Sequence, residues 1–179
     1  MSPPILLYIE DEENDVFFMK HAFKINNTQL VVHSVADGPS AIAYFGGAGE
    51  YADRASFPLP LVVLLDINLP GCSGFEVLKW LRGEPQFEDL PVVMFSSSPR
   101  PEDKKKAHAL GANDFMEKPV SGLDFVAVAA DLHHRWMANC RPDGPFDPDA
   151  GQQGCFEDNK EVIKLLSVSA STLPHCLHS

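Results

Sequence analysis

The sequence lacks long hydrophobic runs and an excess of basic residues. No apolar stretch among its 179 residues approaches the roughly 20 that a membrane-spanning helix needs, and the amino terminus has neither the basic start nor the cleavage site of a signal peptide. The 14 Lys and Arg are outnumbered by 25 Asp and Glu, and the net charge of −11 repels phosphate backbones. We therefore expect a soluble, cytoplasmic protein that spans no membrane and does not bind nucleic acid non-specifically.

Cysteine is scarce and unpaired in the sequence. The four cysteines lie far apart, form no CxxC pair and have no histidine at zinc-finger spacing. We expect reduced thiols rather than disulfides or a zinc site.

The chain has enough apolar residues for one core, because 45% of its residues are hydrophobic. After residue 138 the sequence is broken by proline and glycine, and the remaining 41 residues are too few for a second core. We predict one domain over 1–138 and an acidic Pro/Gly-rich tail over 139–179, largely disordered apart from a short helix near 157–168.

Five short apolar runs alternate with five helical patterns. The runs are 5–9, 30–32, 61–65, 91–95 and 114–116, and the helical patterns are 13–26, 38–45, 73–83, 101–110 and 121–138. Continuously apolar runs are typical of parallel strands covered on both faces, so the alternation predicts an α/β fold with a doubly wound parallel sheet. The long connection over 46–60 is interpreted as a surface loop.

Polar side chains stand where four of these runs end. Glu10 and Asp11 follow the first run, Asp66 ends the third, Ser96 ends the fourth and Lys118 ends the fifth. The carboxyl ends of parallel strands share one edge of the sheet, where such folds bind their ligands. Carboxylates brought together there repel one another, and a hard divalent cation relieves the repulsion. We predict a Mg²⁺ site, with Mn²⁺ as an alternative ion.

The same residues suit phosphoryl transfer. Asp66 could act as an aspartyl nucleophile, and Lys118 could offset the charge on the phosphoryl oxygens. Ser96 could donate its hydroxyl to one of those oxygens, and the carbonyl of Asn68 could reach the metal.

At this point the sequence resembles the receiver domain of response regulators in two-component signalling. The resemblance covers about residues 4–138 and is carried by Ile9-Glu10-Asp11-Glu12, by the segment from Val63 to Gly74, by Val93-Met94-Phe95-Ser96 and by the segment from Gly111 to Pro119. It implies a flavodoxin-like (βα)5 fold with strand order 2-1-3-4-5. It also implies a phosphoacceptor signalling protein, with self-phosphotransfer and autodephosphorylation chemistry, rather than an enzyme acting on external substrates.

The resemblance assigns roles residue by residue. Asp66 would receive a phosphoryl group from a sensor histidine kinase, and Glu10, Asp11, Asp66 and the Asn68 carbonyl would hold the metal. Many relatives carry Asp at position 10, where this chain carries the longer Glu, so that contact could run through water. Asp11 is therefore the safer metal ligand.

A conformational switch is implied as well. Ser96 would be the switch hydroxyl, Lys118 the family's lysine and Phe115 the aromatic switch, whose rotamers only packing can bias because phenylalanine has no hydroxyl. A core aromatic on the fifth strand would give the same sequence, so this alternative stays open. By the same resemblance, the Lys118–Pro119 peptide bond is expected to be cis.

The carboxy-terminal segment matches no DNA-binding output domain. Its three Lys and Arg face six Asp and Glu, which argues against DNA binding. The 46–60 connection, together with residues 78–82, resembles stand-alone regulators that serve phytochrome-type light-sensing kinases. That narrower resemblance implies a bacteriophytochrome as the partner kinase.

The apolar residues of 121–138 form a band too wide for one sheet face to cover. They are Leu123, Phe125, Val126, Val128, Leu132 and Trp136. We predict a homodimer through the 101–138 face. The alternative is that the tail folds back over this band.

Two other functions share the predicted topology. A Mg²⁺-dependent aspartyl-phosphate phosphohydrolase of the haloacid-dehalogenase type needs an acid two residues after its nucleophile, where this chain has Asn68. A flavodoxin-like electron carrier would place a flavin phosphate beside the acidic residues 10–13, which would repel it. A phosphorelay intermediate, which passes its phosphoryl group to a second histidine protein, remains a further alternative.

Overall fold

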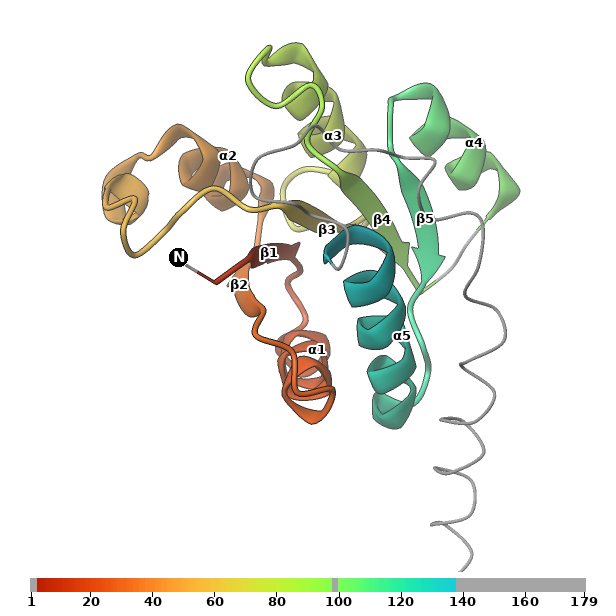
Figure 1. Cartoon of the computed structure of the whole chain (residues 1–179). Helices are drawn as coiled ribbons and strands as arrows, with labels where there is room; N and C mark the ends of the chain where they lie inside the picture. The colour runs from red at the N-terminus through yellow and green to blue at the C-terminus, as the bar shows by residue number, and fades with distance from the viewer. Residues whose placement is uncertain (1–2, 98–99, 138–179) are drawn as a thin grey trace, which may run out of the picture. The chain divides into compact units, whose positions relative to one another are not determined.

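The computed structural model describes residues 3–97 and 100–137, which form one five-stranded sheet with helices on both faces (Figure 1). The strands are β1 (Ile5–Ile9), β2 (Val31–Val35), β3 (Val62–Asp66), β4 (Val92–Ser96) and β5 (Asp114–Glu117). The α-helices are α1 (Glu13–Ile25), α2 (Gly38–Gly46), α3 (Gly74–Gly83), α4 (Pro101–Ala109) and α5 (Phe125–Leu132). All four strand pairings are parallel and the order is β2-β1-β3-β4-β5. This confirms the predicted doubly wound sheet.

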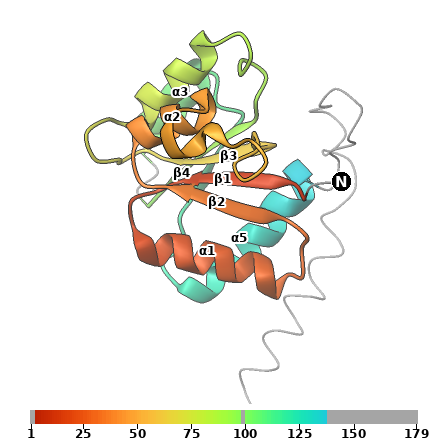
Figure 2. The ribbon, with the colours of Figure 1, turned by 90° about the vertical axis from the view of Figure 1, so that its left-hand side faces the viewer.

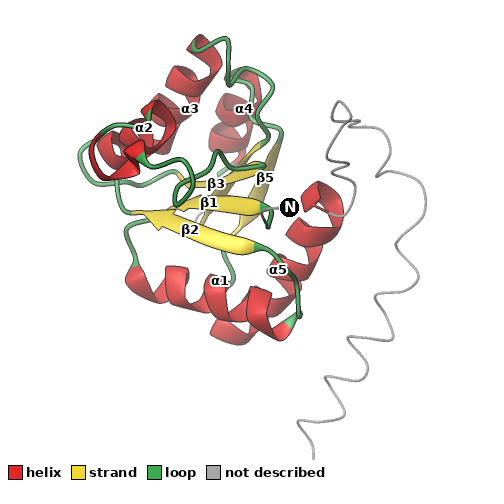
Figure 3. Cartoon of the chain, turned by 60° about the vertical axis from the view of Figure 1, so that its left-hand side comes forward, coloured by secondary structure: helices red, strands yellow, loops and turns green. Residues whose placement is uncertain are grey.

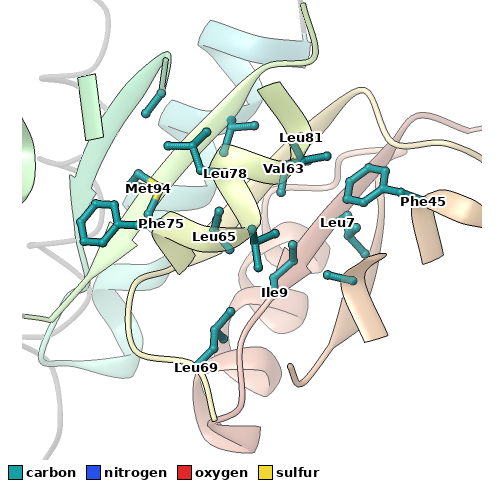
Figure 4. Close-up of a cluster of buried hydrophobic side chains, with 14 of the residues drawn as sticks. Leu7, Ile9, Phe45, Val63, Leu65, Leu69, Phe75, Leu78, Leu81 and Met94 are labelled. Atoms are coloured by element: carbon teal, nitrogen blue, oxygen red, sulfur yellow. The ribbon is translucent and has the colours of Figure 1, made fainter. Parts of the chain in front are cut away.

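The sheet separates two layers of helices. Helices α1 and α5 lie on one face, and α2, α3 and α4 lie on the other (Figures 2 and 3). Successive side chains of a strand point to opposite faces, so Leu7 and Ile9 of β1 join the core under α2 and α3 (Figure 4), whereas Leu6 and Tyr8 join the core under α1 and α5. All five residues in each of β1, β3 and β4 are buried, which explains their continuously apolar sequences.

The segment predicted as one helix over 121–138 is less regular than expected. A 3₁₀ turn (Gly122–Asp124) precedes α5, and a π-helical turn (His133–Met137) follows it. The hydroxyl of Ser121 accepts a hydrogen bond from the backbone N–H of Leu123, which stabilises the 3₁₀ start.

The long connection over 46–60 is a built structure rather than a plain loop. It contains a 3₁₀ turn (Gly49–Ala52), and Arg54 donates hydrogen bonds to the carbonyls of Tyr44 and Phe45 at the end of α2. Carbonyls at a helix carboxyl end have no partner within the helix, so the guanidinium satisfies them. We call residues 46–60 the α2 cap.

The predictions about the cysteines and the tail concern residues that lie mostly outside the described ranges. Cys72 is a free thiol, as expected, and the other three cysteines and the tail over 139–179 lie outside the described residues. Across 3–97 and 100–137, no helix is both long and apolar enough to cross a bilayer.

Candidate functional site

Asp66 ends the central strand β3 and is buried at the carboxyl edge of the sheet. Its Oδ2 accepts a hydrogen bond of 3.2 Å from the backbone N–H of Asn68. The following turn is closed by Gly74, whose N–H donates to the carbonyl of Ile67. A Cβ on Gly74 would lie 2.0 Å from the carbonyl oxygen of Asp66, so a side chain there would displace the loop that carries the aspartate.

The acidic residues that follow β1 converge on Asp66. Glu10 is buried and Asp11 is exposed, and one carboxylate oxygen from each of Glu10, Asp11 and Asp66 lies within 4.8 Å of the others. Oδ1 of Asp66 is buried and has no hydrogen-bond partner among the described atoms. An all-oxygen donor set with a buried oxygen that makes no hydrogen bond fits a hard divalent cation such as Mg²⁺ or Mn²⁺.

Lys118 lies in the middle of this acidic cluster. Its Nζ forms an ion pair with Oε2 of Glu10, and it lies 3.3 Å from Oδ2 of Asp15 and 3.4 Å from Oδ1 of Asp66. The backbone N–H of Lys118 donates to the carbonyl of Ser96, which fixes the lysine beside β4. The sequence analysis missed Asp15, which lies in the first turn of α1, four residues after Asp11 in the loop before that helix.

The electrostatics of the cluster are unbalanced. Among the described side chains of this edge, Glu10, Asp15 and Asp66 pair with the ammonium of Lys118, and Asp11 adds a fourth carboxylate beside Glu10 and Asp66. Burial alone lowers the pKa of Lys118, but the hydrogen bond and charge of Glu10 and the charges of Asp66 and Asp15 outweigh it, so the pKa of this lysine is raised. Burial raises the pKa of Glu10, against the opposing effect of Lys118. The remaining negative charge attracts a cation.

The residues predicted as a switch lie on neighbouring strands. Ser96 is buried at the end of β4, one residue beyond the position paired with Asp66. Phe115 is half-buried on β5, paired with Met94, and the ammonium of Lys104 lies 5.8 Å from the centre of its ring. At this distance the cation from α4 can interact with the ring, which also packs partly against the core.

One prediction is wrong. No described peptide bond is cis, and the Lys118–Pro119 bond is among those described. The trans isomer is intrinsically favoured by about 0.5–1 kcal/mol before proline. The ammonium of Lys118 reaches the acidic cluster with this bond trans.

The chain matches the response regulator receiver domain family over residues 6–130. It belongs to that family. Among curated relatives, the response regulator Rcp1 of Synechocystis sp. is 27% identical over 135 residues, which cover 75% of this chain and 90% of Rcp1.

Solved structures of related response regulators share its fold. The Mn²⁺-bound form of Rcp1 has a TM-score of 0.69 at 26% identity, covering 78% of this chain and 98% of that one. The phosphorylated cyanobacterial phytochrome response regulator RcpA has a TM-score of 0.71 at 27% identity, with coverages of 78% and 97%. RPA3017, from red light signalling of R. palustris, has a TM-score of 0.72 at 30% identity, with coverages of 77% and 96%. This receiver domain thus resembles response regulators of which RcpA is described as a phytochrome response regulator and RPA3017 as acting in red light signalling.

The apolar band of 121–138 is mostly covered within the receiver domain itself. Phe125 and Leu132 are buried, and Val126, Val128 and Trp136 pack partly against the core. The exposed part faces α1, where Leu123 (81% exposed) and Phe17 (61% exposed) line a groove of about 410 Å³. The surface of α4 is mainly charged. The homodimer through 101–138 therefore stays a prediction whose apolar basis is smaller than the sequence indicated.

Proposed function

We propose that this protein is a response regulator whose receiver domain accepts a phosphoryl group on Asp66 from a sensor histidine kinase. The observation that carries the proposal is the position of Asp66, buried at the centre of the sheet edge with Lys118 Nζ 3.4 Å from its Oδ1. That oxygen makes no hydrogen bond among the described atoms, and the ammonium that pairs with it would also face a phosphoryl group attached to Asp66.

The residues around Asp66 support each part of the reaction. Asp11, Asp66, Glu10 and the Asn68 carbonyl would hold Mg²⁺, which when bound would offset charge on the phosphoryl oxygens. The new bond forms between an Asp66 carboxylate oxygen and phosphorus while the bond from phosphorus to the kinase histidine nitrogen breaks, and that nitrogen takes the electron pair.

The lysine and the serine act on the phosphorylated state. Lys118 would place its ammonium against a phosphoryl oxygen, and Ser96 would donate its hydroxyl to another. Movement of Ser96 would free space beside β5, so that Phe115, which already packs partly against the core, would turn further inward and away from Lys104. The surface of α4, β5 and α5 would then report the phosphorylated state to a partner.

The input signal is proposed from the relatives. Rcp1, RcpA and RPA3017 include regulators described as phytochrome or red light components, so we propose a bacteriophytochrome as the kinase. Hydrolysis of external phosphoesters is disfavoured because Asn68, an amide, stands where a general acid is needed.

The phosphoacceptor can be tested directly. The protein is incubated with Mg²⁺ and phosphoramidate, and its intact mass is compared with that of Asp66→Ala and of Asp89→Ala, an exposed carboxylate before β4 at the opposite end of the strands. We expect one phosphoryl adduct on the wild type and on Asp89→Ala, dependent on Mg²⁺, and none on Asp66→Ala. An adduct on Asp66→Ala, or no adduct on the wild type, would contradict the proposal.

A further inference from the structure

We propose that Tyr8 is a positioning residue of the phosphorylation site, acting through Glu10 on Lys118. The inference rests on the proposed function and adds to it a residue that lies inside the core rather than at the edge of the sheet. The tyrosine sets how strongly the Glu10 carboxylate competes with Asp66 for the ammonium of Lys118.

Consecutive contacts connect Tyr8 to Glu10 and Glu10 to Lys118. The hydroxyl of Tyr8 donates to Oε2 of Glu10 over 2.9 Å, and the same oxygen forms the ion pair with Lys118. The other oxygen, Oε1, accepts the backbone N–H of Glu12 over 3.1 Å. Both oxygens of this buried carboxylate are therefore engaged, and one of them is shared between a neutral donor and a cation.

Packing alone does not require a tyrosine at this position. Tyr8 is fully buried on β1 among apolar residues under α1 and α5, and its ring packs edge-on against Phe95 with centroids 6.0 Å apart. A phenylalanine would fill the same space. The hydroxyl adds a polar atom whose burial costs free energy unless it is hydrogen-bonded, and its partner is the carboxylate that binds the lysine.

The ion pair with Oε2 of Glu10 limits how freely the ammonium of Lys118 can interact with a group on Asp66. Lys118 lies between Glu10, Asp15 and Asp66, and a phosphoryl group on Asp66 would need the same ammonium. The hydrogen bond from Tyr8 takes up part of the negative charge on Glu10, which weakens the hold of that carboxylate on the lysine. Without the hydroxyl, Glu10 binds Lys118 more strongly and the phosphoryl group loses part of its counter-charge.

The test separates this role from metal binding and from stability. In Tyr8→Phe we expect beryllofluoride, a phosphoryl analogue, to bind about fivefold more weakly at saturating Mg²⁺, which corresponds to the loss of about one hydrogen bond. Binding of Mn²⁺ alone, followed by its paramagnetic resonance signal, should stay within about twofold of the wild type. The ¹⁵N signal of the Lys118 ammonium should shift in Tyr8→Phe without any phosphoryl analogue.

Tyr44→Phe is the matched control. Tyr44 is an equally buried tyrosine on the other side of the sheet, whose hydroxyl donates to the carbonyl of Pro58 over 2.8 Å. The same hydroxyl lies 2.8 Å from Nδ1 of His33, so Tyr44→Phe removes part-buried contacts with two partners, and a general loss of stability would appear in both variants. We expect Tyr44→Phe to bind beryllofluoride as the wild type does.

The outcomes distinguish the two proposals. A wild-type protein that takes a phosphoryl group on Asp66, beside a Tyr8→Phe variant with unchanged beryllofluoride affinity, overturns the role of Tyr8 alone. An equal loss in Tyr44→Phe, or a parallel loss of Mn²⁺ affinity in Tyr8→Phe, also overturns it. A wild-type protein that takes no phosphoryl group overturns the proposed function, and this inference with it.

Discussion

Two buried tyrosines mark two polar clusters of opposite design. Around Tyr8, at the carboxyl edge of the sheet, several carboxylates face one ammonium. Around Tyr44, which lies in α2 against the α2 cap, the guanidinium of Arg54 donates to backbone carbonyls, and the tyrosine hydroxyl donates to the carbonyl of Pro58. The cap satisfies its polar groups internally, whereas the edge keeps uncompensated charge. The negative charge left at the edge favours binding of a cation, whereas the satisfied polar groups of the cap stabilise the fold.

The largest expected effect comes from removing the ammonium of the edge. Lys118→Met leaves the buried Glu10 beside other carboxylates without its cation, and breaking a buried pair in this way costs about 3 kcal/mol of unfolding free energy. Urea unfolding in EDTA would measure the loss. Addition of Mg²⁺ should restore part of it, because the cation replaces the missing positive charge.

Lys105→Met, an exposed lysine on α4, is the control and should unfold like the wild type. A Lys118→Met variant as stable as this control would show that the edge tolerates its charge imbalance. The contrast between the two clusters would then lose its energetic basis.

The next effect tests the α2 cap. Arg54→Ala removes hydrogen bonds to the carbonyls of Tyr44, Phe45 and Phe57, and should cost about 2 kcal/mol of stability. Phosphorylation of Asp66 should keep its wild-type rate, since the cap lies away from the carboxyl edge. A stability change equal to that of Arg100→Ala, an exposed arginine before α4, would argue that the cap is dispensable.

A smaller effect is the gain in stability that Mg²⁺ should give through the carboxylates at the carboxyl edge of the sheet. At a Mg²⁺ concentration ten times the dissociation constant, the wild type should gain about 1.4 kcal/mol of unfolding free energy. Asp11→Asn should lose this gain and, without metal, should be slightly more stable than the wild type, because one repelling carboxylate is gone. Asp89→Asn, measured in parallel by thermal unfolding, should respond to Mg²⁺ like the wild type. Equal gains in both variants would place the cation elsewhere.

Sequence patterns predicted the sheet and most of the edge because both depend on short-range rules. Continuous apolar runs indicate covered parallel strands, and polar residues at the ends of those runs must meet at one edge. The sequence alone therefore predicts that one edge of the sheet holds Glu10, Asp11, Asp66 and Lys118.

The missed features depend on three-dimensional detail. Tyr8 looks like one more apolar strand residue, and its role is visible only once its hydroxyl is seen against Glu10. Asp15 reaches Lys118 because of the rotation of α1 about its axis, which periodicity gives too coarsely. Arg54 turns the predicted surface loop into a cap through contacts with carbonyls at the end of α2, and backbone carbonyls leave no sequence signal.

The smallest expected effect is a loss of stability at low pH from His33, beside Tyr44. His33 lies against Tyr44, with 2.8 Å between Nδ1 and the hydroxyl, and burial, with a contribution from the charge of Lys20, lowers the pKa of His33 below its ordinary value of 6.5. The folded protein therefore favours the neutral ring, so this contribution to stability is complete above pH 6.5 and is lost as the pH falls through the folded pKa. Unfolding free energies between pH 7 and 5 would measure this loss of stability, and NMR would follow the titration of the His33 ring. His33→Gln should remove this part of the acid sensitivity. His108→Gln, at an exposed histidine, should not. An acid response that persists in His33→Gln would assign the sensitivity to another group. The contacts around Tyr44 would then contribute equally to stability at every pH in this range.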